Sequence, residues 1–137
     1  MNINELMNSK VESTSPDATT KEAARQMHDI HVGCLTVMDD DKLVGIVTDR
    51  DICCKVTATG RVAGFTKVNE IMSTEVITCH EKQSINLAAD TMMKHHIRRI
   101  AVVNDENNIS GFLSVDDLAR ASYELASNVL ESTTSYH

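Results

Sequence analysis

The feature that most constrains this sequence is an internal repeat. The stretch GIVTDRDI at residues 45–52 returns as GFLSVDDL at residues 111–118. These two stretches are 66 positions apart, and a shift of 65, one residue less, places NELM at 4–7 on NEIM at 69–72. Self-similarity at a fixed offset is typical of a repeated supersecondary unit. We therefore expect two copies of one structural unit within the 137 residues.

Each copy shows the same order of predicted elements. A short strand is followed by a helix, which begins after Thr19 in the first copy and after Ser84 in the second, both good N-caps. Two β-rich runs joined by Asp and Asn residues then predict a hairpin. A second helix begins at Thr48 or Ser114. The order β-α-β-β-α, found twice, predicts an α/β fold of the α+β type, and because about 50 residues is small for an independent core, we expect the sheets of the two copies to pack together.

The repeat also suggests domain boundaries. We place the first copy at residues 1–60, a linker at 61–68 and the second copy at 69–122. Residues 123–137 are expected to extend the last helix, without interruption, and to end in a frayed tail, TTSYH.

Composition and charge exclude several classes of protein. The net charge of −7 and the lack of a Lys- or Arg-rich run argue against a nucleic-acid partner. No apolar run approaches the roughly 18 residues of a membrane helix, and the first residues do not resemble a signal peptide. We therefore expect a cytoplasmic protein without a membrane partner, whose cysteines are reduced thiols rather than a disulfide framework: Cys34, Cys53, Cys54 and Cys79.

The repeated stretch fits the pattern Gly-h-h-[Ser/Thr]-x-x-Asp, in which h is apolar. Ser or Thr followed three residues later by an acid resembles a capping box at a strand-to-helix junction. The same groups can also hold a ligand, because a helix N-terminus offers N–H groups to phosphate and an ionised Asp accepts hydrogen bonds from both hydroxyls of a diol. Gly45 and Gly111 would let backbone approach a flat group. The pattern is compatible with capping, with a ribose phosphate site, or with both.

The repeat resembles the cystathionine-β-synthase (CBS) domain family. The resemblance rests on the two motifs in register and on HVGCLTVM and HIRRIAVV before them, and it covers roughly residues 4–120. It implies a stand-alone pair of CBS repeats, a pseudo-two-fold Bateman module packed sheet to sheet. It further implies inter-repeat clefts that bind AMP, ADP, ATP or S-adenosylmethionine, no required cofactor, a homodimer, and regulation of an unidentified partner protein rather than catalysis.

By this resemblance the two copies carry equivalent ligand-binding residues. Asp51 and Asp117 stand where the family holds the ribose hydroxyls, and Thr48 and Ser114 stand where it holds phosphate. The adenine slot would be lined by first-strand residues and by one residue of each motif: Thr14, Ile77, Thr78, and Ile46 or Phe112.

The resemblance also predicts unequal clefts. The stretch HIRRI suggests that Arg98 or Arg99 contacts phosphate, whereas the first copy has Gly33 and Cys34 at these positions and only Arg50 within its motif. We therefore expect the cleft of the second copy to be the first choice of a phosphorylated ligand.

Other interpretations remain open on sequence grounds. The protein could be a constitutive homodimeric scaffold with vestigial clefts, or a sensor on the same fold that responds to thiol oxidation or metal. His28 and His31 have a spacing that can share a helix face, but no further ligand is placed by sequence, so we predict no metal site. Catalytic motifs are not found, and we predict no enzymatic activity.

Overall fold

The computed structural model describes residues 1–134 and divides the chain into two compact units. The first-copy unit consists of Glu12–Val76. The second-copy unit consists of Met1–Val11 together with the chain from Ile77 onward. Of the predicted frayed tail, Thr133 and Thr134 belong to a helix, and residues 135–137 lie outside the described part of the chain.

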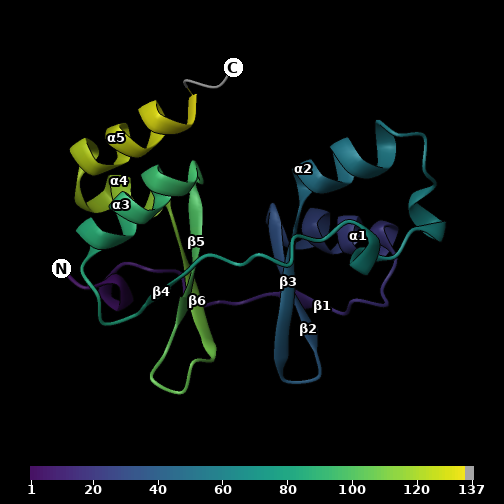
Figure 1. Ribbon diagram of the computed structural model, residues 1–137, viewed down its shortest axis with the longest axis horizontal. Coiled ribbons are helices and arrows are strands. Elements are labelled where there is room, and N and C mark those ends of the chain that lie inside the picture. The colour runs from purple at the N-terminus through teal and green to yellow at the C-terminus, as the bar shows by residue number, and fades with distance from the viewer. Residues whose placement is uncertain (135–137) are drawn as a thin grey trace. The chain divides into compact units, whose positions relative to one another are not determined.

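The first-copy unit is a three-stranded sheet with helices on one face (Figure 1). The strand order is β1-β2-β3, with β1 parallel to β2 and β2 antiparallel to β3. Its elements are β1 (Ser13–Thr14), α1 (Thr20–Ile30), β2 (Cys34–Asp39), β3 (Lys42–Thr48) and α2 (Asp49–Ile52), then a π-helical turn, η2 (Cys53–Thr57), and two 3₁₀ turns, η3 (Ala63–Phe65) and η4 (Val68–Glu70).

The second-copy unit repeats this arrangement and adds a helix. Its sheet has the order β4-β5-β6 with the same parallel and antiparallel pairings. Its elements are η1 (Ile3–Glu5), β4 (Thr78–His80), α3 (Ile85–His95), β5 (Arg99–Val103), β6 (Ile109–Ser114), α4 (Val115–Ala121) and α5 (Tyr123–Thr134). The mixed α/β architecture of two β-α-β-β-α copies is therefore confirmed.

The uninterrupted final helix that we predicted is wrong. Ser122 has extended backbone, with φ −157° and ψ 110°, and separates α4 from α5. Its hydroxyl accepts a hydrogen bond from the Leu125 N–H at 3.2 Å and so caps the start of α5. The break lets α5 turn back and pack against α3 and α4, where Ala126 and Val129 are buried.

The predicted helix starts are confirmed. The Thr19 hydroxyl accepts from the Glu22 N–H at 3.1 Å, and the Ser84 hydroxyl accepts from the Asn86 N–H at 3.1 Å. Each satisfies a backbone donor that the helix itself leaves unpaired.

The two cores are aliphatic and occupy equivalent positions. In the first-copy unit, one face of α1 packs against alternate residues of β2 and β3, and in the second-copy unit α3 and α4 do the same against β5 and β6. The fully buried side chains include Leu35, Val37 and Val47 in the first and Met92, Ile100, Leu113 and Leu118 in the second. No helix among residues 1–134 is both long and apolar enough to cross a lipid bilayer.

The segment before β1, Met1–Val11, belongs to the second-copy unit, and the segment before β4, which ends at Val76, belongs to the first-copy unit. We call these two stretches the crossing segments. Asn8 extends the β6 edge, with N–H to carbonyl bonds to and from Phe112 of 2.9 and 3.0 Å. Ser73 extends the β3 edge in the same way, with two bonds of 2.9 Å to Ile46. The compact units therefore do not coincide with residues 1–60 and 69–122, because the sequence repeat begins before the chain crosses from one unit to the other.

These crossing segments explain the glycine of each motif. A Cβ at Gly111 would lie 2.6 Å from the Asn8 carbonyl oxygen, and a Cβ at Gly45 would lie 2.8 Å from that of Ser73. In this structure the close approach that we expected of a flat ligand is made by the chain's own backbone.

Candidate functional site

Both repeated motifs form a capping box, one of the two roles that the sequence pattern allows. In the second-copy unit, the Asp117 carboxylate accepts from the Ser114 N–H at 2.9 Å, and the Ser114 hydroxyl accepts from the Asp117 N–H at 3.1 Å. In the first-copy unit, the corresponding distances between Asp51 and Thr48 are 3.0 and 3.1 Å. The motifs therefore have a structural role, whatever else they bind.

The second oxygen of each motif carboxylate forms an ion pair with a basic side chain that the sequence analysis did not identify. Asp117 Oδ1 lies 3.0 Å from Arg120 Nη2, and Asp51 Oδ1 lies 3.1 Å from Lys55 Nζ. The same Arg120 donates to the Leu6 carbonyl at 3.1 Å, and Lys55 donates to that of Ile71 at 3.0 Å. Each cation thus joins a motif carboxylate to the crossing segment.

The spacing of these cations was a signal in the sequence. Arg120 follows Asp117 by three positions and Lys55 follows Asp51 by four, so both can meet the carboxylate on one helical face. A carboxylate oxygen has more than one lone pair, so these bonds leave each motif Asp able to accept further donors.

In the second-copy unit, strand register brings four predicted residues onto one face of the sheet. Arg99 pairs with Ser114, and Thr78 and Phe112 are both paired with Ala101. Because partners across strands share a face and neighbours along a strand alternate, these four residues lie together. We call them the second-copy motif face. The opposite face carries the core residues Cys79, Ile100, Val102 and Leu113.

Two other predicted residues of the same unit lie elsewhere. The Arg98 guanidinium donates to the Thr133 hydroxyl at 3.1 Å and is thereby directed to α5. Ile77 packs against the buried core cluster. Both arginines are exposed, and Arg99 is the one whose backbone pairs with Ser114.

The first-copy unit has an equivalent face with a different composition. Cys34 pairs with Thr48, and Ser13 and Ile46 are both paired with Thr36. Cys34 therefore takes the position beside Thr48 that Arg99 takes beside Ser114. Arg50 is exposed in the first turn of α2, where its N–H donates to the Asp49 carboxylate at 2.8 Å.

Thr14, which we expected to line the adenine slot, does not lie on this face of the sheet. Thr14 pairs with Val37, which belongs to the core side of the sheet, and Ser13 takes the position equivalent to Thr78. In a strand only two residues long, the alternation of side chains cannot be read from the sequence.

Comparison with known proteins decides the family. The model of the CBS domain matches residues 3–57 and 68–124. The chain belongs to the CBS domain family. It is 39% identical over 117 residues to the CBS domain-containing protein YhcV of Bacillus subtilis, covering 85% of this chain and 82% of that protein.

Solved structures show the same CBS fold. A conserved CBS domain protein of unknown function from Thermoplasma acidophilum superposes with a TM-score of 0.88 at 22% identity, covering 96% of this chain and 75% of the other. The CBS domain pair of protein MJ0100, solved with 5′-methylthioadenosine and S-adenosyl-L-methionine, superposes with a TM-score of 0.79 at 27% identity. That match covers 88% of this chain and 94% of the other.

The cysteines of this CBS pair differ in exposure. Cys53 and Cys54 are exposed on the π-helical turn, and Cys79 is buried within β4. Burial raises the pKa of the Cys79 thiol, and a hydrogen bond with Thr91 acts in the opposite direction. Within residues 1–134, no three His, Cys, Asp or Glu side chains are grouped so that they could hold a metal ion.

This difference predicts selective alkylation. With iodoacetamide at pH 8, we expect Cys53 and Cys54 to react at least about tenfold faster than Cys79, because the attacking species is an accessible thiolate and the raised pKa leaves Cys79 mostly protonated. Mass spectrometry of tryptic peptides over time measures the rates, with protein unfolded in urea as the control in which the difference disappears. Equal rates in the folded protein would contradict the burial of Cys79.

Proposed function

We propose that this CBS pair is a non-catalytic regulatory module that binds an adenosine-containing ligand on the second-copy motif face and passes its occupancy to a partner protein. The observation that carries the proposal is the register that sets Arg99 beside Ser114, the N-cap residue of the helix that carries Asp117. At this junction between strand and helix, one ligand could meet two hydrogen-bond donors, the guanidinium and the hydroxyl, and one acceptor, the carboxylate.

Each group has a role that follows from its chemistry. Asp117 would accept hydrogen bonds from the ribose hydroxyls, since a carboxylate can accept from two donors. Arg99 and the Ser114 hydroxyl would donate to phosphate, with the guanidinium supplying charge-assisted bonds. Thr78 and Phe112, which pair with Ala101 from the two neighbouring strands, would contact the adenine.

The comparisons support the ligand class. The two molecules named for the MJ0100 pair, 5′-methylthioadenosine and S-adenosyl-L-methionine, both contain adenosine. In this chain the charge of Arg99 favours a phosphorylated member of the class, so we expect AMP, ADP or ATP to bind more tightly than S-adenosylmethionine. On the first-copy face, where Cys34 replaces the arginine, we expect weaker binding of phosphorylated ligands.

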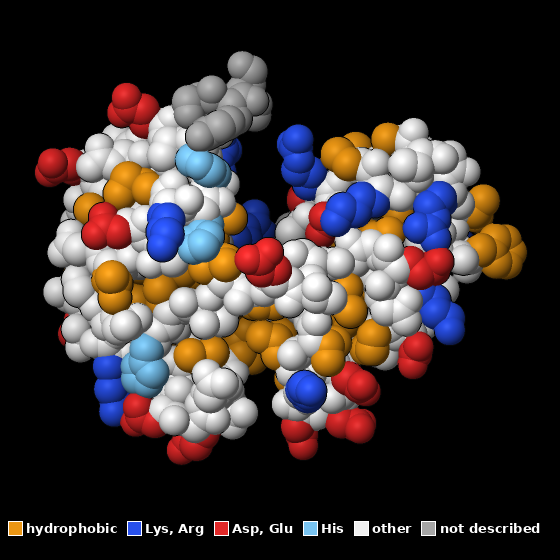
Figure 2. All heavy atoms as spheres, viewed as in Figure 1, with side chains coloured by type: hydrophobic (Ala, Val, Ile, Leu, Met, Phe, Trp, Pro, Cys, Tyr) orange, Lys and Arg blue, Asp and Glu red, His pale blue; other side chains and the backbone are white. Residues whose placement is uncertain are grey.

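Nucleic acid is a poor fit as the ligand. On the face shown in Figure 2, Lys and Arg side chains are interspersed with acidic ones, so no continuous basic surface follows a phosphate backbone there.

A scaffold role is the second candidate, and one observation favours it. Both oxygens of Asp117 already have partners, the Ser114 N–H and Arg120, and those bonds alone would explain why the motif is present. A scaffold would keep these bonds whichever nucleotide is added, whereas a sensor would exchange some of them for ligand.

A thermal melt with added AMP, ADP, ATP, S-adenosylmethionine or GTP tests the proposal. A ligand at about 100 times its dissociation constant stabilises the folded state by about 2.7 kcal/mol, which for a chain of this size raises the midpoint by roughly 5 to 12 °C. We expect this shift with an adenine nucleotide in the unmodified protein and its loss in Asp117→Asn, which keeps the size and an acceptor oxygen of the side chain but removes its charge.

The matched control is Asp116→Asn, an equal change of charge at the exposed neighbouring position of α4. This variant should keep the nucleotide-induced shift. If no nucleotide at millimolar concentration stabilises the unmodified protein, the sensor proposal fails and the scaffold role is favoured. A response to peroxide that disappears on replacing Cys53 and Cys54 with serine would instead favour a thiol sensor.

A further inference from the structure

A basic side chain bridges the motif carboxylate and the crossing segment in each copy. In the second copy the bridge is Arg120, whose Nη2 lies 3.0 Å from the Asp117 carboxylate and donates to the Leu6 carbonyl at 3.1 Å. In the first copy Lys55 forms the corresponding bridge, and the carbonyl that it reaches is that of Ile71. Leu6 and Ile71 are equivalent in the repeat, because each is the third residue of NELM or NEIM.

The two bridging residues are not themselves equivalent. When the motifs are aligned, Cys54 stands at the Arg120 position and Ala121 stands at the Lys55 position. A guanidinium three positions after one motif Asp and an ammonium four positions after the other therefore reach the same pair of oxygens. Two different side chains form one arrangement from two different positions, which indicates that the bridge itself has a role in both copies.

Helix capping does not account for the bridge. The capping bond from the Ser114 N–H uses Oδ2 of Asp117, whereas Arg120 contacts Oδ1. A carboxylate held at one oxygen can still turn about χ2, which has a broad minimum in Asp, and contacts at both oxygens hold its plane. The two hydroxyls of a ribose need both oxygens in fixed positions, because each hydroxyl donates one hydrogen bond. The bridge therefore gives the carboxylate the orientation that a diol requires.

The crossing segment that accepts from Arg120 also contacts the other end of the second-copy motif face. Two positions after Leu6, Asn8 exchanges both backbone hydrogen bonds with Phe112, the residue that we expect to contact adenine. The segment is therefore attached both where the ribose would bind and where the base would bind. It then continues to Ser13 of β1, which lies on the equivalent face of the first-copy unit.

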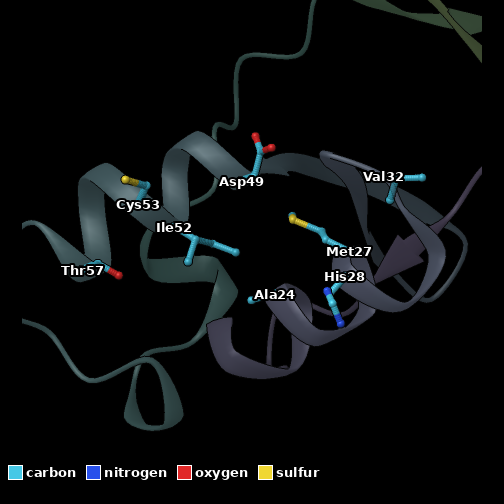
Figure 3. A pocket seen from close by; sticks show the side chains of 8 residues that line it. All are labelled: Ala24, Met27, His28, Val32, Asp49, Ile52, Cys53 and Thr57. Atoms are coloured by element: carbon cyan, nitrogen blue, oxygen red, sulfur yellow. The ribbon is translucent and has the colours of Figure 1, made fainter.

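The bridge of the first copy is separate from the pocket on the helical side of that unit (Figure 3). The pocket is lined by side chains of α1, α2 and η2 that include Met27, Ile52 and Cys53. The Lys55 ammonium instead contacts the motif carboxylate and a carbonyl of the crossing segment. The bridge is thus a feature of the motif and not of the pocket.

We propose that Arg120 is a positioning residue for ribose recognition, which orients the Asp117 carboxylate and links its occupancy to the crossing segment at Leu6–Asn8. The inference rests on the proposed function, because it concerns the ligand site on the second-copy motif face. When ribose hydroxyls bind Asp117, the carboxylate loses freedom to move, and the bridge passes that restriction to the segment. Ligand binding and the attachment of the segment are then linked reciprocally. Lys55 has the same role at the first-copy face.

A nuclear magnetic resonance titration of the full ¹⁵N-labelled chain tests this role. The probes are AMP and ATP and their 2′-deoxy forms, which lack one of the two ribose donors. The Ser114 and Asp117 amides report binding at the second-copy face, since both belong to its capping box. The variant Arg120→Met removes the donors of a side chain that is 63% exposed.

We expect Arg120→Met to raise the dissociation constant for AMP or ATP roughly three- to tenfold, the size of effect found for residues in one hydrogen-bond network. For the 2′-deoxy forms the rise should stay below about twofold, because a single hydroxyl does not need both carboxylate oxygens. A purely structural role of Arg120 would weaken both kinds of nucleotide equally.

A rescue variant follows from the repeat. The double variant Arg120→Met, Ala121→Lys places a lysine four positions after Asp117, as in the first copy, at a position that is exposed. It should restore both the affinity and the preference for ribose over 2′-deoxyribose. The matched control is Lys94→Met, an equal loss of charge at an exposed position of α3, which should bind like the unmodified protein. Hydrogen exchange at the Asn8 amide should slow when AMP or ATP binds the unmodified and rescued proteins, and should change less in Arg120→Met.

Three results would overturn the inference alone. They are unchanged affinity for AMP and ATP in Arg120→Met, an equal loss of affinity for ribose and 2′-deoxyribose nucleotides, or nucleotide binding by the unmodified protein that leaves exchange at Asn8 unchanged. If neither AMP nor ATP binds the unmodified protein at millimolar concentration, the phosphorylated ligand of the proposed function fails together with this inference.

Discussion

Replacing Leu118 with alanine is expected to lower the free energy of unfolding by about 2 to 5 kcal/mol, the range found for deleting a buried leucine side chain. Leu118 has no exposed surface and belongs to the cluster that joins α3, α4 and α5 to the sheet. The large loss has two parts, the lost transfer of apolar surface from water and the cavity that a packed core cannot refill. Urea unfolding followed by circular dichroism measures it.

The repeat supplies the control for this prediction. Ile52 occupies the same motif position in the first copy but is only partly buried, and among the described residues no counterpart of α5 follows α2. Ile52→Ala should therefore cost less than about 1.5 kcal/mol, since part of the truncated side chain already contacts water. Equal losses at the two positions would contradict the difference in burial between Leu118 and Ile52.

Gly111→Ala is expected to destabilise the second-copy unit by about 1 to 3 kcal/mol. The new Cβ would lie 2.6 Å from the Asn8 carbonyl oxygen, and backbone rather than a flexible side chain would have to move. The shift would strain the two hydrogen bonds between Asn8 and Phe112, which hold the N-terminal segment to the edge of β6. Thermal melting measures the loss, and hydrogen exchange should show faster exchange at the amides of both residues.

The control is Gly64→Ala, where the nearest atom to the new Cβ is the Lys21 Cδ at 3.9 Å. Because the space is open and the backbone conformation is one that alanine adopts, this variant should be neutral or more stable by a few tenths of a kcal/mol. A Gly111→Ala protein as stable as Gly64→Ala, with unchanged exchange at Asn8, would show that the N-terminal segment does not pack on β6 as described.

Local features were predictable because their causes are local in the sequence. The caps at Thr19, Ser84, Thr48 and Ser114 are confirmed, since each depends on a side chain and an N–H within three residues. The hairpins also agree with the predicted runs and turns. The break at Ser122 was missed, because helical residues surround it and only the packing of α5 on α3 and α4 favours the extended conformation there.

The candidate site was only partly predictable. Ser114 and Asp117 follow from the motif, and Arg99 beside Ser114 follows from the hairpin register, which a sequence can suggest but not fix. The position of Thr14 depended on which face of a two-residue strand its side chain takes, and Ile77 lies just before β4 and packs against the core. The second role of Arg120, as a donor to Leu6, joins residues 114 positions apart and has no local signal.

The repeat, the order of the elements and the motif chemistry follow from the amino-acid sequence alone, because periodicity, capping and turn residues act over a few positions. Two further features appear only in the folded chain: the segment before each copy joins the other compact unit, and α5 turns back onto α3 and α4. Both depend on contacts between distant parts of the chain, where the burial of apolar surface selects among arrangements that the local sequence permits equally.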